Sequence, residues 1–309
     1  MAPPQVFVID VDNGDEVFYP GSIVSGRVNL QTSDQKKLRG IYLTLFGHAY
    51  VNWSQGSGEH RVYYQDEEPY FKIRVNLWGG DGRGRFLQPG NYQFPFSFKL
   101  PEVNLPGSHE GGIGRVRYWL EARMDRPWKF DHVTKRAFTI LERVDLNLGQ
   151  DLAVPRRGEN QKTLGCLCCK TGPLTLTAST DRGGYCPGEN ILVTAHVGND
   201  TDKEMRRLKA TLYRHVVYYA RGRSRFKSDI VSQMQTNDPI PARGNFEWNQ
   251  QPLPIPASPP SSHTCRIIHT DYMLDIEVVA PNHSINLHLN IPIVIGTEPL
   301  RSVYANSTL

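Results

Sequence analysis

The sequence predicts an all-β fold made of two tandem antiparallel β-sandwich domains with no substantial helix. Alternating apolar and polar residues, broken by Gly, Pro, Asn and Asp, recur along most of the chain of 309 residues. This pattern is typical of sandwich strands, and no stretch carries a sustained helical apolar stripe. The chain also repeats itself, and its length suits two domains of about 150 residues.

The first part of the repeat starts at a Pro-Gly turn. The pair at 20–21 in "YPGSIVSGRVNL" matches the pair at 187–188 in "YCPGENILVTAHV". We call this the early alignment. Continued without a gap, it places "GIYLTLFGHAY" on "RLKATLYRHVV", where Thr44, Leu45 and His48 meet identical residues. One spacing held across both segments indicates a duplicated strand order.

In the second part of the repeat, fewer residues separate the matching positions of the two copies. There "YWLEA" (118–122) aligns with "YMLDI" (272–276), and positions 137–140 align with 291–294. The change falls between strands, where turns tolerate insertions. A unit of about 160 residues is too long for a solenoid repeat, so we expect two copies of one domain.

The alternation predicts a series of strands in each copy. They are 5–11, 23–31, 38–51, 70–77, 90–99, 115–125 and 136–144 in the first copy, and 174–179, 191–197, 205–220, 228–235, 266–279 and 285–295 in the second. We predict domains at 1–147 and 171–298, a short tail at 299–309, and a linker at 148–170. The linker segment "GQDLAVPRRGENQKT" is polar and contains Pro and Gly, as linkers do.

Composition narrows the class of protein. A net charge of +4, from 35 basic and 31 acidic residues, does not indicate nucleic acid as a partner. The start of the chain has no basic segment before an apolar run, and no apolar run reaches the roughly 18–20 residues that span a bilayer. Five cysteines without a secretion signal favour reduced thiols. We therefore expect a cytoplasmic protein.

Several longer segments resemble the arrestin-domain-containing proteins, the α-arrestins. They are "LQPGNYQFPFSFKLP" (87–101), "RVRYWLEARMDRPW" (115–128), "KTLGCLCCKTGPLTL" (162–176), "GYCPGENI" (184–191) and "PIVIGTEPL" (292–300). Their order and spacing cover nearly the whole chain. At 78–90, "WGGDGRGRFLQPG" is non-helical where visual and β-arrestins carry a short helix, which favours the α branch.

This resemblance implies two arrestin-type sandwiches and the work of an adaptor. Such proteins bind the cytosolic tails of membrane receptors and transporters and recruit ubiquitin ligases, which directs the cargo into endocytic and endosomal traffic. It also implies recruitment to the plasma membrane or endosomes and peripheral membrane contact. An alternative is a coat-like sorting subunit, because the retromer subunit of arrestin fold shows that the architecture does not determine the task.

A second alternative concerns the ubiquitin ligase. Relatives of this kind usually bind HECT-type ligases through PPxY motifs in a tail. In this sequence Pro3-Pro4 and Pro259-Pro260 are not followed by tyrosine at the required position. Three alternatives therefore stay open: a shortened product of a chain with such a tail, an indirect ligase link through a partner, or a regulatory α-arrestin that binds cargo without a ligase.

The strongest charged feature lies in "RHVVYYARGRSRFK" (214–227). Arg221, Arg223, Arg225 and Lys227 alternate with other residues, so on a strand they would share one face. Arginine forms bidentate contacts with phosphates and carboxylates. The patch is interpreted either as a site for phosphorylated tails or anionic lipid, or as an edge whose charges prevent aggregation.

The cysteine cluster has three interpretations. Cys166, Cys168 and Cys169, with Cys186 as a fourth ligand, could hold zinc, although adjacent cysteines fit the usual spacing poorly. The cluster could instead be S-acylated beside Lys170, or could pack as small apolar residues.

The sequence predicts neither a catalytic residue nor a cofactor. It contains no GxSxG, HExxH or P-loop motif. Aromatic strand residues such as Tyr118 and Trp119 are expected to fill the sandwich core and its rim rather than to stack on RNA bases.

Overall fold

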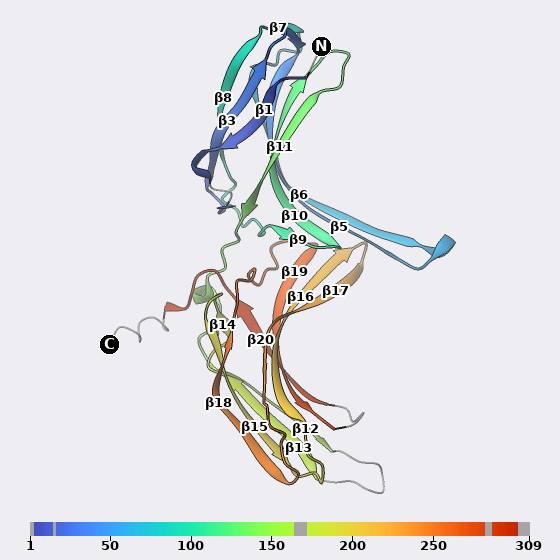
Figure 1. Cartoon of the computed structure of the whole chain (residues 1–309), viewed down its shortest axis with the longest axis vertical. Coiled ribbons are helices and arrows are strands. Elements are labelled where there is room, and N and C mark those ends of the chain that lie inside the picture. Colours follow the sequence, from blue (N-terminus) through green and yellow to red (C-terminus); the bar gives the residue numbers. More distant parts are fainter. Residues whose placement is uncertain (1–2, 15–16, 164–171, 282–285, 302–309) are drawn as a thin grey trace. The chain divides into compact units, whose positions relative to one another are not determined.

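The computed structural model describes residues 3–14, 17–163, 172–281 and 286–301. The chain divides into two compact units (Figure 1). The first contains Met1–Glu142, Tyr218–Arg225 and His263–Ile268, and the second contains Arg143–Val217, Phe226–Ser262 and His269–Leu309.

Strands dominate the described residues, which confirms the predicted all-β class. The helices with assigned bounds are three single 3-10 turns, η1 (Asp12–Gly14), η2 (Gly58–His60) and η3 (Leu146–Leu148). None of the described helices combines the length and the apolar character that crossing a bilayer requires.

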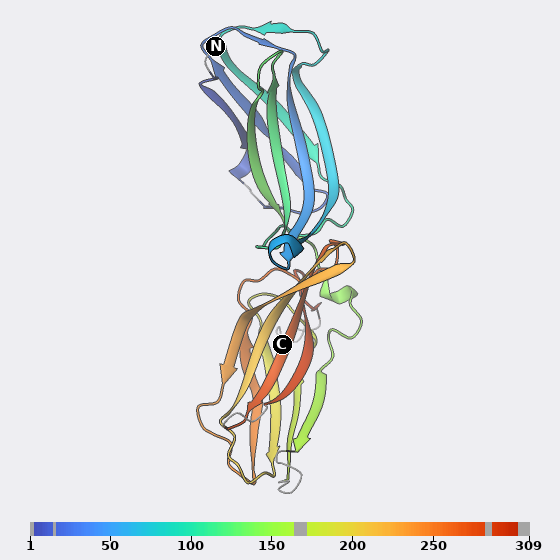
Figure 2. The same cartoon turned by 90° about the vertical axis from the view of Figure 1, so that its right-hand side faces the viewer.

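The described residues of the first sandwich form eleven strands. They are β1 (Val6–Val11), β2 (Val17–Phe18), β3 (Ile23–Thr32), β4 (Lys36–Leu38), β5 (Gly40–Gln55), β6 (Val62–Gly79), β7 (Arg85–Leu87), β8 (Gly90–Lys99), β9 (His109–Glu110), β10 (Gly114–Asp125) and β11 (His132–Ile140). One sheet has the order β1-β3-β8, and the larger sheet has the order β2-β11-β10-β5-β6, with β9 on β10. Figure 2 shows the larger sheet in front, with β11, β10, β5 and β6 side by side.

Strand β3 shows why the opening segment folds as it does. Every second residue, including Val24 and Val28, is buried, while the residues between them face outwards or lie partly covered. Gly26 lies among the buried positions, and a Cβ there would stand 2.0 Å from the backbone oxygen of Asp10. Only glycine lets strand β1 approach β3 this closely.

In the second sandwich, nine strands lie in the part of the chain that the structure describes. They are β12 (Arg156–Thr163), β13 (Pro173–Thr180), β14 (Gly184–Tyr185), β15 (Asn190–Asn199), β16 (Arg207–Ala220), β17 (Arg223–Gln235), β18 (Gly244–Pro254), β19 (Ile268–Val279) and β20 (Leu287–Ile295). They form sheets with the orders β12-β13-β15-β18 and β14-β20-β19-β16-β17. The inward side chains of both sheets build one core, to which Leu176, Leu212 and Leu274 belong.

The repeat found in the sequence is also a repeat of strands. The early alignment places position 20 on position 187. With this spacing, the first and last residues of β3 fall on the first and last residues of β15, and those of β2 fall on those of β14. The two central strands also alternate alike, with Val24 matched by the buried Ile191. Two tandem sandwiches are therefore confirmed.

The predicted alignment of positions 137–140 with 291–294 is wrong by one residue. In the first sandwich Tyr118 pairs with Phe138, whereas the matching Tyr272 pairs with Ile293. The last strands therefore align one position later than the sequence predicts, because the connection before β20 is one residue longer than the connection before β11. Since a one-residue slip moves every side chain to the opposite face, residues 137–140 do not match 291–294.

Strand β12 lies within the segment that its composition predicts as a linker. Arg156–Thr163 pairs along its whole length with β13 at the edge of its sheet. Most of its side chains are exposed, so an edge strand of this kind has the polar composition of a loop.

Candidate functional site

The outward face of the larger sheet of the first sandwich carries a regular array of aromatic side chains. On β5, Tyr42, Phe46 and Tyr50 are partly buried and alternate with fully buried core residues. Across the sheet on β10, Trp119 pairs with Phe46, and their rings stack with centroids 4.9 Å apart. The pleat places these side chains on one face because residues two apart point the same way.

Each of these aromatic rings has a cationic group beside it. The charge centre lies 3.6 Å from the ring centroid for Arg74 over Tyr42, 5.5 Å for Lys72 over Phe46, 5.0 Å for Arg115 over Tyr50, and 5.9 Å for Lys135 over Trp119. We call these eight residues the cation–aromatic face. Each such contact is worth about 0.5–1 kcal/mol when exposed, so the array is stable without a ligand.

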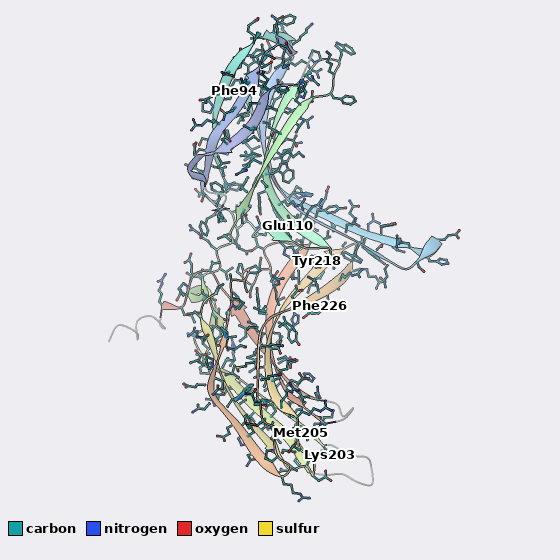
Figure 3. The ribbon with its side chains drawn as sticks, in the orientation of Figure 1. Phe94, Glu110, Lys203, Met205, Tyr218 and Phe226 are labelled. Atoms are coloured by element: carbon teal, nitrogen blue, oxygen red, sulfur yellow. The ribbon has the colours of Figure 1, made fainter. Side chains whose placement is uncertain are left out.

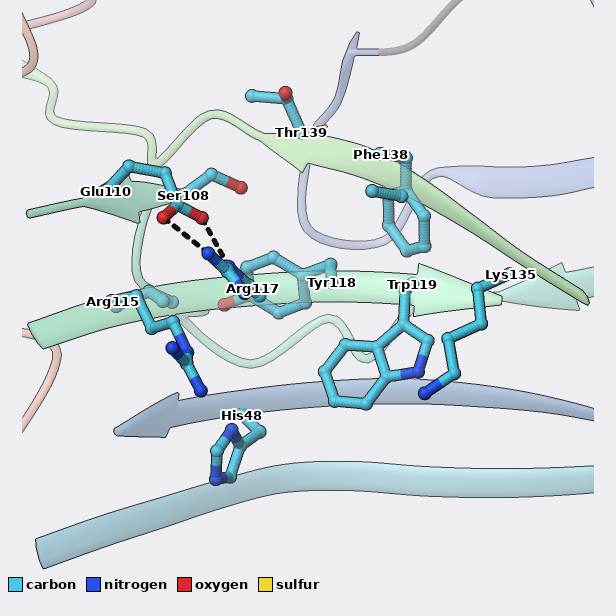
Figure 4. A pocket seen from close by; sticks show the side chains of 12 residues that line it. His48, Ser108, Glu110, Arg115, Arg117, Tyr118, Trp119, Lys135, Phe138 and Thr139 are labelled. Carbon is cyan, nitrogen blue, oxygen red and sulfur yellow. Dashed lines mark hydrogen bonds and ion pairs between the residues drawn. The ribbon is translucent and has the colours of Figure 1, made fainter. Parts of the chain in front are cut away.

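A groove of about 720 Å³ lies on this side of the sheet. Figure 4 shows Arg115, Arg117 and Trp119 along its floor, with Lys135 and His48 beside them. A groove of this size accommodates several residues of an extended peptide.

A bidentate ion pair belongs to the lining of the groove. Arg117 Nε and Nη2 donate to the two carboxylate oxygens of Glu110 at 2.5 and 2.8 Å, the dashed lines in Figure 4. Hydrogen bonding from Arg117 holds the pKa of Glu110 below its ordinary value. This pair is therefore ionised at neutral pH and its charges cancel.

Glu121 lies at the centre of a second charge cluster on the same face. Arg123 Nη2 and Lys135 Nζ each lie 3.0 Å from its carboxylate. Burial opposes ionisation of Glu121, but the hydrogen bonds from the two cations outweigh it and lower its pKa. The cluster therefore fixes Lys135 in its place beside Trp119.

The Glu121 cluster predicts a pH-dependent contribution to stability. Because the pKa of Glu121 is lower in the folded than in the unfolded chain, its contribution is complete above the unfolded pKa of about 4.3 and is lost as pH falls through the folded pKa. Replacing Glu121 by glutamine is expected to cost about 1–2 kcal/mol at pH 7 and progressively less below pH 4.

Urea unfolding of the wild type and the variant, followed by hydrogen exchange of β10 and β11, measures this difference at each pH. A difference between the two proteins that stays constant down to pH 3 would contradict the ionic origin of the effect.

The structure also places the basic patch that the sequence predicts. Arg223, Arg225 and Lys227 alternate along β17 and are exposed, whereas Arg221 lies in the preceding turn with a left-handed φ of 49°. Lys227 contacts the carboxylate of Asp229 at 2.9 Å, so part of its charge is neutralised. Binding of an anionic partner by these residues stays a prediction.

The structure describes one of the four cysteines that the sequence suggests as zinc ligands. Cys166, Cys168 and Cys169 lie outside the described residues. Cys186 is a buried free thiol, and burial raises its pKa to about 11. It is therefore protonated at neutral pH when no metal is bound, and the zinc interpretation stays a prediction.

The cation–aromatic face is not among the sites that the sequence predicts. Its signal lay in the residues between the apolar positions of "GIYLTLFGHAY" and "RVRYWLEAR", where aromatic and basic residues alternate with the core. Only the strand register, which pairs Trp119 with Phe46 and Thr44 with Arg74, brings the two segments together.

Comparison with known proteins decides the family. The model of the arrestin (or S-antigen) N-terminal domain matches residues 7–147, and that of the C-terminal domain matches residues 170–300. The chain belongs to the arrestin family. This confirms the resemblance on which the sequence analysis relied.

Several curated relatives align over most of the chain. Arrestin domain-containing protein 17 of Caenorhabditis elegans is 30% identical over 95% of this chain and 70% of its own length. Human arrestin domain-containing protein 4 is 32% identical over 90% of this chain and 68% of its own. Human thioredoxin-interacting protein is 29% identical over 94% of this chain and 74% of its own. The family match therefore extends over both sandwiches.

Proposed function

We propose that the protein is a non-catalytic adaptor that binds cytosolic tails of membrane receptors or transporters and directs them into endocytic or endosomal traffic. Membership of the arrestin family supports the adaptor role. The observation that carries the proposal is the cation–aromatic face of the first sandwich. We further propose that the protein works in the cytoplasm, is recruited to the plasma membrane or endosomes with its cargo, and meets a ubiquitin ligase through a partner.

The chemistry of the face favours an acidic, extended peptide. Among the described residues, Lys72, Arg74 and Arg115 contact aromatic rings and have no carboxylate within ion-pair distance. Their charges are available to acidic or phosphorylated side chains, and the rings between them offer apolar contacts. Glu110 and Glu121 are already paired with cations, and the three available cations outnumber the exposed Glu67, so the face attracts anions.

Reversing two of these charges tests the proposal. Replacing Lys72 and Arg74 by glutamate is expected to weaken binding of fluorescent acidic and phosphorylated tail peptides about tenfold, because attraction becomes repulsion at two positions. Fluorescence anisotropy at low salt measures the dissociation constant. The loss should shrink as salt rises, since the charges are exposed.

A matched control has the same change in net charge on the second sandwich. Arg157 and the exposed Lys203, labelled in Figure 3, are replaced by glutamate, and peptide binding should stay close to that of the wild type. Equal losses in both variants would mean that net charge rather than the face governs binding. Charge reversal at Arg221, Arg223 and Arg225 in the same assay tests the β17 patch as a second contact.

Affinity purification of the native protein tests the adaptor role itself. Transient capture of membrane cargo, endosomal components and a ligase is expected. Stable recovery within one large complex would favour the coat-like alternative. Recovery of neither a ligase nor an endosomal component would contradict the proposal.

A further inference from the structure

One end of the first sandwich displays aromatic side chains that the rest of the protein leaves uncovered. Trp128 is 101% exposed and Phe130 is 94% exposed, both in the turn between β10 and β11. Phe86 on β7 is 54% exposed. Large aromatic residues are seldom left in water in this way, and the three lie at loop ends rather than over a sheet face.

The two loops that carry these rings are neighbours. Lys37 on β4 pairs with Phe86 on β7, and its ammonium lies 5.8 Å from the ring centroid. A hollow of about 350 Å³ is lined by residues of both loops, including Lys37, Gly82 and Trp128. In Figure 1 the β10–β11 turn reaches the same end of this sandwich as β7. The three rings thus belong to one surface.

The turn is braced so that Trp128 points outwards. The backbone N–H of Arg126 donates to the Asp131 carboxylate at 2.9 Å, and Arg126 Nε donates to the backbone oxygen of Phe130 at 2.7 Å. Trp128 has a left-handed φ of 60°, which is unfavourable for a residue with a Cβ. The bonds on either side of Trp128 hold this backbone conformation, which keeps the ring directed away from the sandwich.

The same surface is positively charged. The segments 36–39, 80–87 and 125–131 contain six accessible Lys and Arg residues, besides the buried Lys36, against three Asp residues. The aspartates are already paired: Asp81 with Arg85, Asp125 with Arg39, and Asp131 with Arg123. In the described part of the chain, Lys37, Arg83 and Lys129 have no carboxylate within ion-pair distance. Free cations therefore surround the exposed rings.

We propose that this surface inserts into the headgroup region of a bilayer that contains anionic lipid. We call it the aromatic tip and define it by Phe86, Trp128, Phe130, Lys37, Arg83 and Lys129. Tryptophan prefers the boundary between water and hydrocarbon because its ring is apolar and its N–H is polar. Lysine and arginine near the surface add attraction to anionic headgroups. The proposal goes beyond cargo binding and does not depend on it.

Vesicle binding by the full chain tests the proposal. The wild type is expected to co-sediment with phosphatidylcholine vesicles that contain phosphatidylserine and to bind much less to vesicles of phosphatidylcholine alone. Replacing Trp128 and Phe130 by alanine is expected to weaken binding at least about tenfold, because two rings no longer leave water. Replacing Lys37 and Lys129 by glutamate is expected to weaken it by a similar factor.

Brominated lipids locate the inserted residue directly. Bromine quenches tryptophan fluorescence only at short range, and Trp128 is one of five tryptophans. The variant Trp128→Phe keeps an apolar ring and is expected to retain most of the binding but to lose most of the quenching. Quenching that persists in this variant would place a different tryptophan in the membrane and overturn the proposal.

The controls separate this surface from general stickiness. Val103 and Leu148 are 65% and 84% exposed, and their replacement by alanine should leave vesicle binding unchanged. The tip residues are exposed, so every variant should keep the wild-type circular dichroism and melting curve. Failure of the wild type to bind phosphatidylserine vesicles, or equal binding to both kinds of vesicle, would overturn the proposal. Peptide capture in solution, without vesicles, reports separately on the proposed adaptor function.

Discussion

Replacing Arg182 by alanine is expected to lower the free energy of unfolding of the second sandwich by about 3–5 kcal/mol. The Arg182 guanidinium lies 3.2 Å from the Asp181 carboxylate and 3.1 Å from that of Glu189. It also donates to the backbone oxygen of Gly184 and covers the buried ring of Tyr185 at 4.4 Å. Its removal leaves two poorly solvated carboxylates without a cation. Urea unfolding followed by hydrogen exchange of β14 and β15 measures the loss.

Two further variants test whether the loss of stability comes from the contacts of Arg182. Arg182→Lys keeps the charge but loses the planar fork that reaches both carboxylates, so an intermediate loss is expected. Arg157→Ala removes an exposed arginine from the same sandwich and should change stability by less than about 0.5 kcal/mol. A loss in Arg182→Ala no larger than in Arg157→Ala would contradict the structural role of the cluster.

The Arg182 cluster shows that equivalent turns in the two sandwiches are held by different chemistry. Phe18 and Tyr185 occupy matching, buried positions in the early alignment. Phe18 packs edge-on against Phe138 with ring centroids 5.5 Å apart. The Tyr185 hydroxyl instead donates to Asp181 at 2.7 Å, and Asp181 also accepts from the backbone N–H of Leu192. The two copies therefore share geometry rather than interactions.

Strand alternation made most of the fold predictable. Strand β18 is not among the predicted strands, and the hairpin of β5 and β6 is longer than predicted. The sequence predicts that one strand ends at 51 and the next begins at 70, whereas β5 runs to Gln55 and β6 starts at Val62. No residue of β6 is buried, and those at 62–70 are exposed or only partly covered. A hairpin without a covered face gives no apolar alternation, so its sequence is typical of a loop.

The candidate site was only partly predictable for a related reason. The β17 patch could be read from the sequence because Arg223, Arg225 and Lys227 follow one another along a single strand. The cation–aromatic face requires four strands in their correct register. Lys135 reaches Trp119 only because β11 pairs with β10, and Lys72 reaches Phe46 only because β6 pairs with β5. Alternation tells which side chains share a face, not which strands are neighbours.

Replacing Leu45 or Leu212 by alanine is expected to destabilise the sandwich that contains it by about 2–5 kcal/mol. The two leucines match in the sequence repeat, and both are fully buried. On β5, Leu45 lies between Ile73 and Leu120 of the neighbouring strands. Each substitution removes apolar atoms from a packed interior that cannot collapse fully, so a cavity adds to the lost transfer free energy. Hydrogen exchange with mass spectrometry measures the loss in each sandwich.

The distribution of these losses tests whether the repeat describes two separate cores. Leu45→Ala should reduce protection mainly in β5 and its neighbours, and Leu212→Ala mainly in strands of the core that contains Leu274. Because the two sites share no partner, the losses in the double variant should add to within about 0.5 kcal/mol. Asn52→Ala, at an exposed position of β5, serves as the control and should change little. A loss below about 1 kcal/mol at either leucine would mean that its side chain is not part of a close-packed interior. The two leucines would then be equally buried without contributing equally to the free energy of unfolding.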